Sequence, residues 1–336
     1  MKIGQRVIDK HSPTFIIAEL SANHNGSIET ALETIKAARE AGADCVKFQT
    51  YTPDTITLDH RSEHFKITQD TIWDGKYLYD LYKEAYTPWE WHKELFEACS
   101  KEGLIYFSSP FDVTAVDFLE NLNVPAYKIA SFEITDIPLI EYAASKMKPM
   151  IISSGIASLE DIQLAIDTCR NVGNNEIALL KCTSNYPAPL DQSNLSMIKD
   201  FSEKFDVIPG LSDHTEGSIA PITSIALGAK IIEKHFILNK NIGGPDASFS
   251  MDKEEFKCMV DSVRAAESSL GTVDYTLTKE QLKSREFSRS LFVVKDIKIG
   301  EKFTHENIRS IRPWHGLHPK HLNEIIGLES KKEIKK

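Results

Sequence analysis

The sequence lacks long uninterrupted hydrophobic runs, and it has few cysteines for its length. No stretch approaches the roughly 18 consecutive apolar residues of a membrane span, and the N-terminal segment lacks the apolar core of a secretory signal peptide. The five cysteines are scattered and never spaced as C-x-x-C, which argues against a disulfide framework or a zinc knuckle and favours a reducing compartment. We therefore expect a cytoplasmic protein without a membrane segment.

Positive charge is scarce relative to negative charge. The 336 residues include 39 Lys and Arg against 49 Asp and Glu, a formal net charge of −10. This balance argues against binding to nucleic acid or to anionic membranes, so neither partner is expected. An anionic small-molecule substrate remains compatible with the net charge, because a single pocket can be locally basic.

What the sequence does contain is a regular alternation of short apolar runs and amphipathic stretches. Most of the runs are too short for helices and are rich in Ile, Val and Phe, as buried parallel strands are. Several amphipathic stretches end in Gly, a common helix stop, and Ser158 is placed to cap one of them. The predicted strands are 15–20, 44–49, 104–109, 126–131, 149–154, 176–183, 207–213 and 230–236. Eight β units, each followed by a helix, predict an α/β fold of the (β/α)₈ TIM-barrel type, with an open doubly wound sheet as the alternative.

The barrel pattern ends near Gly271, and the composition changes after it. We predict a catalytic TIM-barrel domain at 1–271, a polar linker at 272–284 and a small β-rich domain at 285–336. About 50 residues are marginal for an independent core, so this domain should lean on the barrel or on another subunit. Its segment KDIKIG at 295–300 is echoed by KEIKK at 332–336, where the chain stops before a second turn glycine. We expect the natural chain to continue some residues further.

Polar side chains gather at the C-terminal ends of nearly all predicted strands, where barrel enzymes carry out their chemistry. Lys47 and Lys128 lie within apolar strands, and a buried ammonium group needs a counter-charge. They point to an anionic substrate, and the serines and glycine at 153–155 can supply the donors that phosphate requires. The alternative is that one of these lysines pairs with Glu19 or Glu133 inside the barrel.

Two histidines, His214 and His235, end the seventh and eighth predicted strands. Imidazoles held on neighbouring strands suit a divalent cation with open coordination positions, which then acts as a Lewis acid. Asp213, Glu19 and Glu133 lie at the same end and favour this interpretation over hydrogen-bonded packing histidines, which remain the alternative. His24 is a weaker candidate ligand.

Two loops near the predicted site are candidates for binding substrate. Segment 51–76 is longer than a barrel connection needs, and long ordered loops are often functional. Segment 243–250, GGPDASFS, follows the eighth strand, and its Asp246 could bind hydroxyl groups, although an ordinary turn fits the spacing nearly as well. Trp73 is interpreted as a packing residue rather than a substrate platform.

Several motifs together resemble those of a known family. AELSANHNG, VKFQTYTPDTITLD, YKIASFE, IISSGIAS, LLKCTSNYP, GLSDHT, EKHF and GGPDASFS are similar, in order and position, to segments of the sialic acid synthase (nonulosonic acid synthase) family. The tail, with SLFVVKDIKIGEKFTHENI and RPWHGLHP, resembles that family's C-terminal antifreeze-like (SAF, β-clip) domain. The phrases YTPDTITLD, TIWDGKYLYDLYKEAYTPWEW and SAN are most similar to the family's pseudaminic acid branch.

The resemblance implies a transferase that condenses phosphoenolpyruvate with an N-acetylated amino sugar and releases phosphate. In the pseudaminic branch the acceptor is 2,4-diacetamido-2,4,6-trideoxy-L-altrose; the alternative is N-acetylneuraminic or legionaminic acid synthesis from N-acetylmannosamine or a related acceptor. A divalent metal is also implied, Mn²⁺ first, with Co²⁺ and Mg²⁺ as alternatives. So is a homodimer with domain-swapped antifreeze-like domains. More distant alternatives are a Schiff-base aldolase with Lys128 as nucleophile and a non-catalytic sugar-binding protein.

The resemblance also implies roles for individual residues. Metal coordination falls to His214 and His235, and catalytic roles fall to Glu133, Glu19 and Lys128, with Glu133 in proton transfer. The residues implied to bind phosphoenolpyruvate are Lys47, Lys128, Ser131, Ser153 and Ser212. Those implied to bind the sugar are Glu19, Tyr186, Asp246 and Arg312, the last reaching from the antifreeze-like domain into the partner's site. The family often has Asn at the position of Ser184, which here precedes Asn185, so a direct phosphate contact at this point is not implied.

Overall fold

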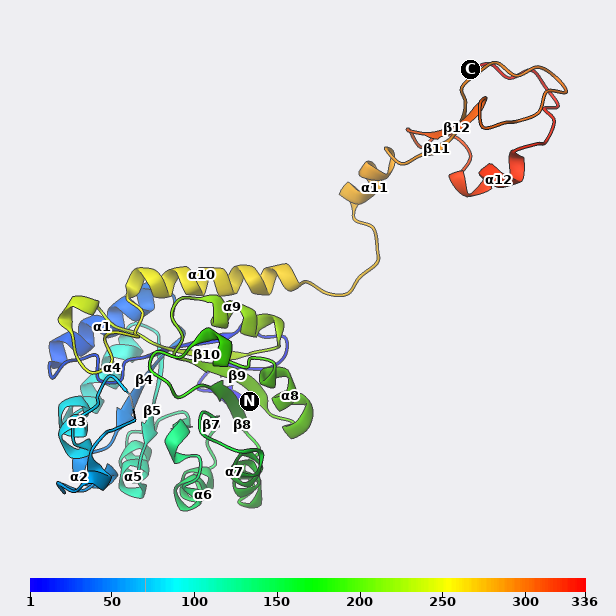
Figure 1. The fold of residues 1–336 in the computed structure, drawn as a ribbon. Coiled ribbons are helices and arrows are strands. Elements are labelled where there is room, and N and C mark those ends of the chain that lie inside the picture. The colour runs from blue at the N-terminus through cyan, green and yellow to red at the C-terminus, as the bar shows by residue number, and fades with distance from the viewer. Residues whose placement is uncertain (70) are drawn as a thin grey trace. The chain divides into compact units, whose positions relative to one another are not determined.

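The computed structural model describes residues 1–69 and 71–336, so the long loop at 51–76 is described apart from residue 70. The chain divides into two compact units, Met1–Gly271 and Thr272–Lys336. The larger unit contains the barrel, and the smaller one contains a two-stranded sheet (Figure 1). None of the helices in the described residues is both long and apolar enough to cross a membrane.

Eight parallel strands of the larger unit close into a barrel in sequential order (Figure 1). The strands are β3 (Phe15–Glu19), β4 (Cys45–Thr50), β5 (Ile105–Pro110), β6 (Tyr127–Ile129), β7 (Met150–Ser153), β8 (Ile177–Cys182), β9 (Ile208–Asp213) and β10 (Ile231–His235). Each predicted strand overlaps one of them, so the TIM-barrel prediction is confirmed. The open-sheet alternative is wrong, because the last strand pairs with the first and His235 lies opposite Glu19.

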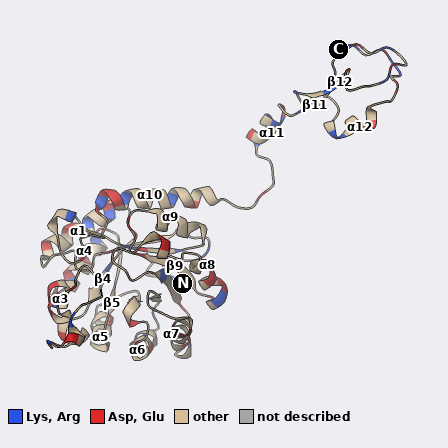
Figure 2. Cartoon of the chain, viewed as in Figure 1, with Lys and Arg blue, Asp and Glu red and all other residues tan. Residues whose placement is uncertain are grey.

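Helices follow the barrel strands and cover the outside of the barrel (Figure 1). They are α1 (Ile28–Glu40), α2 (Pro53–Ile56), α3 (Leu78–Ala85), α4 (His92–Lys101), α5 (Val113–Asn121), α6 (Ile137–Ser145), α7 (Leu159–Asn171), α8 (Met197–Phe205), α9 (Ile219–Ala226) and α10 (Lys253–Leu270). Short 3₁₀ turns are η1 (Glu63–Phe65), η2 (Trp89–Trp91), η3 (Ser131–Glu133), η4 (Leu190–Gln192) and η5 (Lys240–Ile242). Ser158 caps α7 as predicted, since its hydroxyl accepts from the Asp161 N–H. Acidic and basic residues alternate along α10 (Figure 2).

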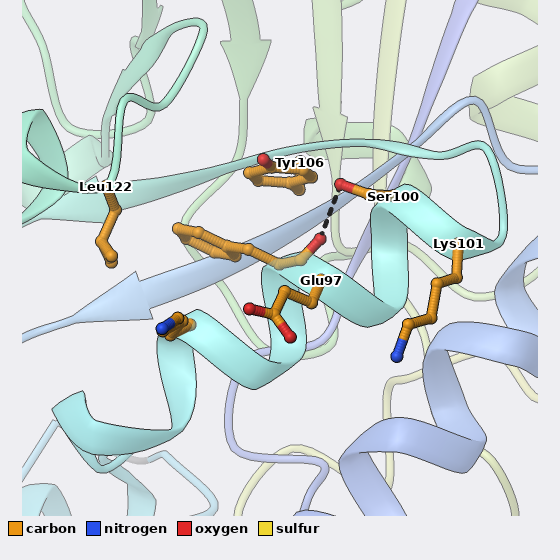
Figure 3. Close-up of a pocket in the computed structure, with 7 residues that line it drawn as sticks. Glu97, Ser100, Lys101, Tyr106 and Leu122 are labelled. Carbon is orange, nitrogen blue, oxygen red and sulfur yellow. Dashed lines mark hydrogen bonds between the residues drawn. The ribbon is translucent and has the colours of Figure 1, made fainter.

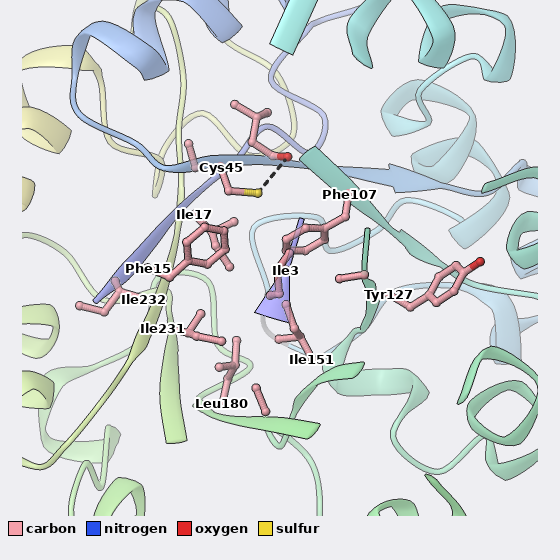
Figure 4. Packing of buried hydrophobic residues seen from close by; sticks show 14 of the residues in the cluster. Ile3, Phe15, Ile17, Cys45, Phe107, Tyr127, Ile151, Leu180, Ile231 and Ile232 are labelled. Carbon is pink, nitrogen blue, oxygen red and sulfur yellow. Dashed lines mark hydrogen bonds between the residues drawn. The ribbon is translucent and has the colours of Figure 1, made fainter. Parts of the chain in front are cut away.

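The N-terminal end of the barrel is closed by apolar side chains. A hairpin of β1 (Lys2–Ile3) and β2 (Arg6–Val7) precedes the first barrel strand. Its Ile3 is fully buried and lies among side chains of the barrel strands, including Phe15 and Phe107 (Figure 4). Because this end is filled, the polar side chains that a substrate can reach lie at the opposite, C-terminal end of the strands.

The smaller unit is built around a short antiparallel hairpin. It contains α11 (Lys279–Arg285), β11 (Ser290–Val293), β12 (Ile308–Ile311), η6 (Pro319–His321) and α12 (Leu322–Ile325). Three buried side chains, Leu291, Ile297 and Ile308, form its core. The two echoed segments pair with each other, because Ile297 and Ile334 exchange N–H···O bonds of 2.9 Å. The echo in the sequence is therefore a structural repeat, with equivalent isoleucines facing one another across a bridge.

Candidate active site

Four buried charged side chains meet inside the C-terminal end of the barrel. Lys47 Nζ lies 3.1 Å from Glu19 Oε2 and 3.0 Å from Glu233 Oε1. Lys128 Nζ lies 4.0 Å from the same Glu233 oxygen. The four residues, called the barrel cluster below, come from β3, β4, β6 and β10. The pairing of Lys47 with Glu19, which the sequence left open as an alternative, is thus present.

Two groups of the barrel cluster have pKa values that burial has moved toward neutral pH. Burial raises the pKa of Glu19 to about 7, with Lys47 lowering it and Glu233 raising it further. Burial also lowers the pKa of Lys128 to about 8, despite the attraction of Glu233. For Lys47 burial acts in the same downward direction, but the two carboxylates outweigh it and raise the pKa. Perturbed groups of this kind, packed into one mouth of a barrel, are typical of binding and catalytic sites.

A group of hydroxyls lies beside Lys128. Its Nζ donates to Ser153 Oγ at 2.6 Å and to the Ile129 carbonyl at 3.0 Å. The Gly155 N–H donates to Ser131 Oγ at 3.1 Å. A Cβ on Gly155 would collide with Ser184 Oγ and lie 2.6 Å from Ser131 Oγ, so only glycine lets these two hydroxyls approach.

These groups form what we call the hydroxyl cradle: Ser131, Ser153, Ser184 and the backbone of Gly155. Hydroxyls and a backbone N–H next to an ammonium group are suited to binding a phosphate or carboxylate. Sequence reasoning left Ser184 outside the substrate-binding set. The structure places its hydroxyl at the cradle, while Asn185 is exposed.

The two histidines predicted to bind metal lie side by side. The ring centroids of His214 and His235 are 5.3 Å apart. His214 Nδ1 lies 2.9 Å from the Thr183 carbonyl, and donation to that oxygen leaves Nε2 as the free ligand nitrogen. Burial lowers the pKa of His235 well below its usual value, which keeps the ring in the neutral form that binds metals.

The donor atoms around these histidines fit an open metal site. His235 Nδ1 is buried without a hydrogen-bond partner among the described residues, and Asp246 Oδ2 lies 3.8 Å from it. Nowhere in residues 1–69 and 71–336 do three His, Cys, Asp or Glu side chains converge as in a closed structural site. Two imidazoles with a nearby carboxylate would leave coordination positions to water and substrate oxygens, as catalytic sites require.

Three further predicted residues of the larger unit lie at the same end of the barrel. Ser212 Oγ donates to Glu233 Oε1 at 3.1 Å. Burial raises the pKa of Asp246, whose Oδ2 accepts from the Ala22 N–H at 3.4 Å. Burial also raises the pKa of Glu133 to about 7, and its Oε2 has no hydrogen-bond partner among the described residues. Arg312 is exposed in the smaller unit, immediately after β12.

His24, the weaker candidate ligand, makes local contacts instead. Its Nδ1 accepts from the Gly26 N–H at 3.0 Å, and its Nε2 lies 3.3 Å from Thr87 Oγ1. Burial lowers its pKa to about 4. With both nitrogens engaged in hydrogen bonds, His24 is a packing residue.

Besides Ser184, two further members of the site were not among the predicted site residues. Glu233 joins the barrel cluster, and Cys182 Sγ lies 3.8 Å from His214 Nδ1. The signal for Glu233 was its position two residues before His235, because alternate residues of a strand share a face. Cys182 ends the sixth barrel strand, but its position was hidden among scattered cysteines.

A separate pocket lies on the outside of the barrel. It has a volume of 350 Å³ and is lined by residues of α4 together with Tyr106 and Leu122 (Figure 3). Its Ser100 hydroxyl donates to the Phe96 carbonyl at 3.0 Å, within the helix. Because this pocket lacks the buried charges found at the strand ends, the barrel mouth is the candidate active site.

A closed barrel with buried lysines, carboxylates and paired histidines at its strand ends belongs to the class of TIM-barrel enzymes. The model of the NeuB family matches residues 34–275, and the SAF domain model matches residues 288–336. The chain therefore belongs to the NeuB family, and the sialic acid synthase family indicated by its motifs is confirmed. Enzymes of this family are generally metal-dependent.

Alignments with similar proteins cover nearly the whole chain. The pseudaminic acid synthase of Campylobacter jejuni is 49% identical over 335 residues, which cover 100% of this chain and 97% of the relative. The pseudaminic acid synthase of Helicobacter pylori is 50% identical, covering 96% and 95%. The crystal structure of the N-acetylneuraminic acid synthetase from Leptospira borgpetersenii, in complex with citrate, superimposes with a TM-score of 0.75 at 30% identity, covering 84% and 94%.

Proposed function

We propose that this chain synthesises pseudaminic acid from phosphoenolpyruvate and 2,4-diacetamido-2,4,6-trideoxy-L-altrose, with release of phosphate. The reaction is that of a transferase of the nonulosonic acid synthases. Support for the acceptor comes from two pseudaminic acid synthases at 49% and 50% identity over almost the full chain. The proposal of an anionic substrate rests on one observation, which is that the barrel cluster lies beside the hydroxyl cradle.

The binding of phosphoenolpyruvate uses the lysines of the barrel cluster. The charges of Lys47 and Lys128 face its carboxylate and phosphate, since charge-assisted hydrogen bonds are strong where water is excluded. The hydroxyls assigned to the same substrate are those of Ser131, Ser153 and Ser212. Ser184 joins them through the cradle. When the anion binds, Lys47 pairs with it and interacts less strongly with Glu19 and Glu233. Glu19 can then form a hydrogen bond with the sugar.

The sugar lies at the histidine side of the mouth. A divalent ion held by His214 and His235, Mn²⁺ in this proposal, would supply a Lewis acid for the acceptor's aldehyde. Glu19, Tyr186 and Asp246 orient the sugar by hydrogen bonds. Burial makes these contacts more effective than they would be in water.

The chemistry requires one carbon–carbon bond and one proton acceptor. The C3 carbon of phosphoenolpyruvate attacks the aldehyde carbon, and the aldehyde oxygen takes up a proton to become a hydroxyl group. Water adds to the resulting cationic C2 and loses a proton to the Glu133 carboxylate, whose pKa of about 7 suits this role. As the C2–O bond to phosphate breaks, the C2 hydroxyl gives its proton to the departing phosphate, which leaves the 2-keto acid and inorganic phosphate. Lys128 stabilises the negative charge of the departing phosphate.

The smaller unit has a separate role in the proposal. Its core of three buried side chains is small, so stable packing against a second copy of the chain is favoured. We place it in a domain-swapped homodimer, in which Arg312 reaches the N-acetyl group of the sugar in the partner's site.

The direct test is phosphate release from phosphoenolpyruvate by the purified protein with Mn²⁺. Parallel reactions contain the diacetamido-trideoxy-altrose, N-acetylmannosamine or no sugar, and each is repeated with a chelator. Release only with the altrose sugar, abolished by the chelator and restored by added Mn²⁺, is the expected result. Release with N-acetylmannosamine instead would keep the mechanism and replace the acceptor, whereas borohydride trapping of Lys128 without metal would support the aldolase.

A further inference from the structure

The long loop after β4 places a tryptophan in the barrel mouth. Trp73 Nε1 donates to the Pro245 carbonyl at 3.1 Å, in the loop that follows β10. Its ring centroid lies 5.5 Å from that of Tyr186 and 6.3 Å from that of Phe249. The neighbouring Ile72 is 49% exposed, so the tryptophan is the residue of this turn that is anchored at the site. The interpretation of Trp73 as an ordinary packing residue therefore needs revision.

Trp73 extends an aromatic surface that begins at the histidines. The Tyr186 ring lies 4.3 Å from His214, and the Phe249 ring lies 4.9 Å from His235. Tyr186 and Phe249 are themselves 5.1 Å apart. Trp73, Tyr186 and Phe249, called the aromatic wall below, thus run outward from the point where the aldehyde would bind.

The chemistry of the acceptor matches an apolar wall. With its aldehyde at the histidines, the sugar must extend its remaining carbons along this surface. The diacetamido-trideoxy sugar has a methyl group at C6 and two acetamido methyls, whereas a 6-hydroxylated sugar would press a hydroxyl against aromatic carbon. Burying that hydroxyl without a partner costs free energy. A hydrophobic surface discriminates against an added hydroxyl by roughly a hundredfold at most.

We infer that Trp73 determines specificity for the acceptor by contacting its apolar end, so that a methyl group at C6 is preferred to a hydroxymethyl group. This inference rests on the proposed function, because it assumes a sugar aldehyde at His214 and His235. Tyr186 and Phe249 complete the surface, but Trp73 is its outermost ring and comes from a loop outside the barrel framework.

The test compares two acceptors that differ only at C6. The wild type, Trp73→Leu and Trp73→Phe are assayed with 2,4-diacetamido-2,4,6-trideoxy-L-altrose and with its 6-hydroxy counterpart. Trp73→Leu is expected to lower kcat/KM for the 6-deoxy sugar about tenfold, through KM, and to lower it less for the 6-hydroxy sugar. Trp73→Phe should retain most of the preference. The KM for phosphoenolpyruvate should not change, and Ile72→Ala, on the same turn, should behave as wild type.

The outcomes separate this inference from the proposed function. Equal losses for both sugars, or a change in the KM for phosphoenolpyruvate, would mean that Trp73 only holds the loop in place, and the inference would be wrong. An unchanged ratio in Trp73→Leu would also overturn it, while wild-type activity with the 6-deoxy sugar leaves the proposed function intact. A wild type that accepts only the 6-hydroxy sugar would overturn both. Thermal melting of each variant checks that the fold is retained.

Discussion

Two buried ionic groups lie back to back on β10 and differ in how completely they are satisfied. Glu233 points into the barrel and joins the barrel cluster, whereas the next residue, Lys234, pairs with Asp213 at 2.6 Å. Lys234 also donates to the Thr215 carbonyl and, at 3.3 Å, to the Gly217 carbonyl. Asp213 in turn accepts from both the N–H and the hydroxyl of Thr215. All three ammonium protons of Lys234 therefore have acceptors within the protein.

The barrel cluster is not saturated in this way. Glu233 Oε2 is buried without a hydrogen-bond partner among the described residues, and the pKa values of Glu19 and Lys128 are displaced toward neutrality. Buried polar groups in native proteins nearly always have hydrogen-bond partners. A buried group that lacks one therefore indicates a binding site for another molecule. We infer that the pair of Lys234 and Asp213 stabilises the loop that carries His214, whereas the barrel cluster is available to bind substrate.

The largest expected effect comes from removing a charge of the barrel cluster. Lys47→Met should lower kcat/KM for phosphoenolpyruvate by about 10³-fold, because the substrate loses its ammonium partner in a site that excludes water. The loss of stability at pH 6 should be small, since Glu19, with its pKa of about 7, is already mostly protonated at that pH and is not left as an unpaired charge. Steady-state phosphate release and thermal melting measure the two effects.

A matched control for Lys47 lies on the surface. Lys240 pairs with Glu255 at 2.6 Å, but both side chains are well exposed. Lys240→Met should change stability by less than about 1 kcal/mol and leave activity unchanged. If Lys47→Met unfolded the protein at pH 6 yet left kcat/KM of the folded fraction intact, the barrel cluster would be structural and the contrast with Lys234 would disappear.

Removing Lys234 should lower the stability of the protein strongly and its activity little, the opposite of removing Lys47. Lys234→Met leaves the Asp213 carboxylate buried without its cation, and such a change costs about 3–5 kcal/mol of unfolding free energy. The KM for phosphoenolpyruvate should stay within about twofold, because Lys234 lies on the other face of the strand. Urea denaturation and kinetics at a temperature where the variant is folded give the two numbers. A large rise in KM with normal stability would assign Lys234 to the active site instead.

The sequence predicted the barrel and the buried lysines at its mouth for identifiable reasons. Parallel strands buried on both faces are nearly continuous apolar runs, and a lysine within such a run stands out, as Lys47 and Lys128 do. The N-terminal hairpin could not be seen in this way, because strands of two residues have no periodicity. Neither could the approach of Ser184 to Ser131, which depends on the absence of a side chain at Gly155. The contacts of Trp73 could not be predicted either, because its partners lie more than 100 residues away in sequence.

A smaller effect is expected at Glu133, where one substitution should raise stability and lower activity. Its pKa is about 7 in the folded protein against an ordinary 4.5, so the folded state binds more protons than the unfolded state between these values. The carboxyl group therefore costs stability progressively as pH rises from 4.5 to 7, by up to about 3 kcal/mol above that range. Glu133→Gln should raise the unfolding free energy at pH 8, change little at pH 4, and lose activity.

The pH profile of the wild type sharpens this prediction. If the Glu133 carboxylate accepts a proton from water, kcat should rise as pH increases through about 7. The exposed Glu141 on α6 provides the control, since Glu141→Gln should alter neither stability nor the profile. A Glu133→Gln variant with wild-type kcat at pH 8 would exclude the residue from proton transfer.

The smallest expected effect concerns the hydroxyl cradle. Gly155→Ala adds one methyl group that must displace Ser184 and Ser131, and overpacking of this kind costs about 1–3 kcal/mol. Because the displaced hydroxyls belong to the proposed phosphate site, the KM for phosphoenolpyruvate should rise about tenfold while the KM for the sugar stays the same. Adding Ser184→Gly removes one of the colliding atoms and should restore part of the affinity. If the double variant binds phosphoenolpyruvate more weakly than Gly155→Ala alone, Ser184 contributes a hydroxyl to the substrate. If it recovers fully, the cradle depends on Ser131 and Ser153, and Ser184 only occupies the space that Gly155 leaves.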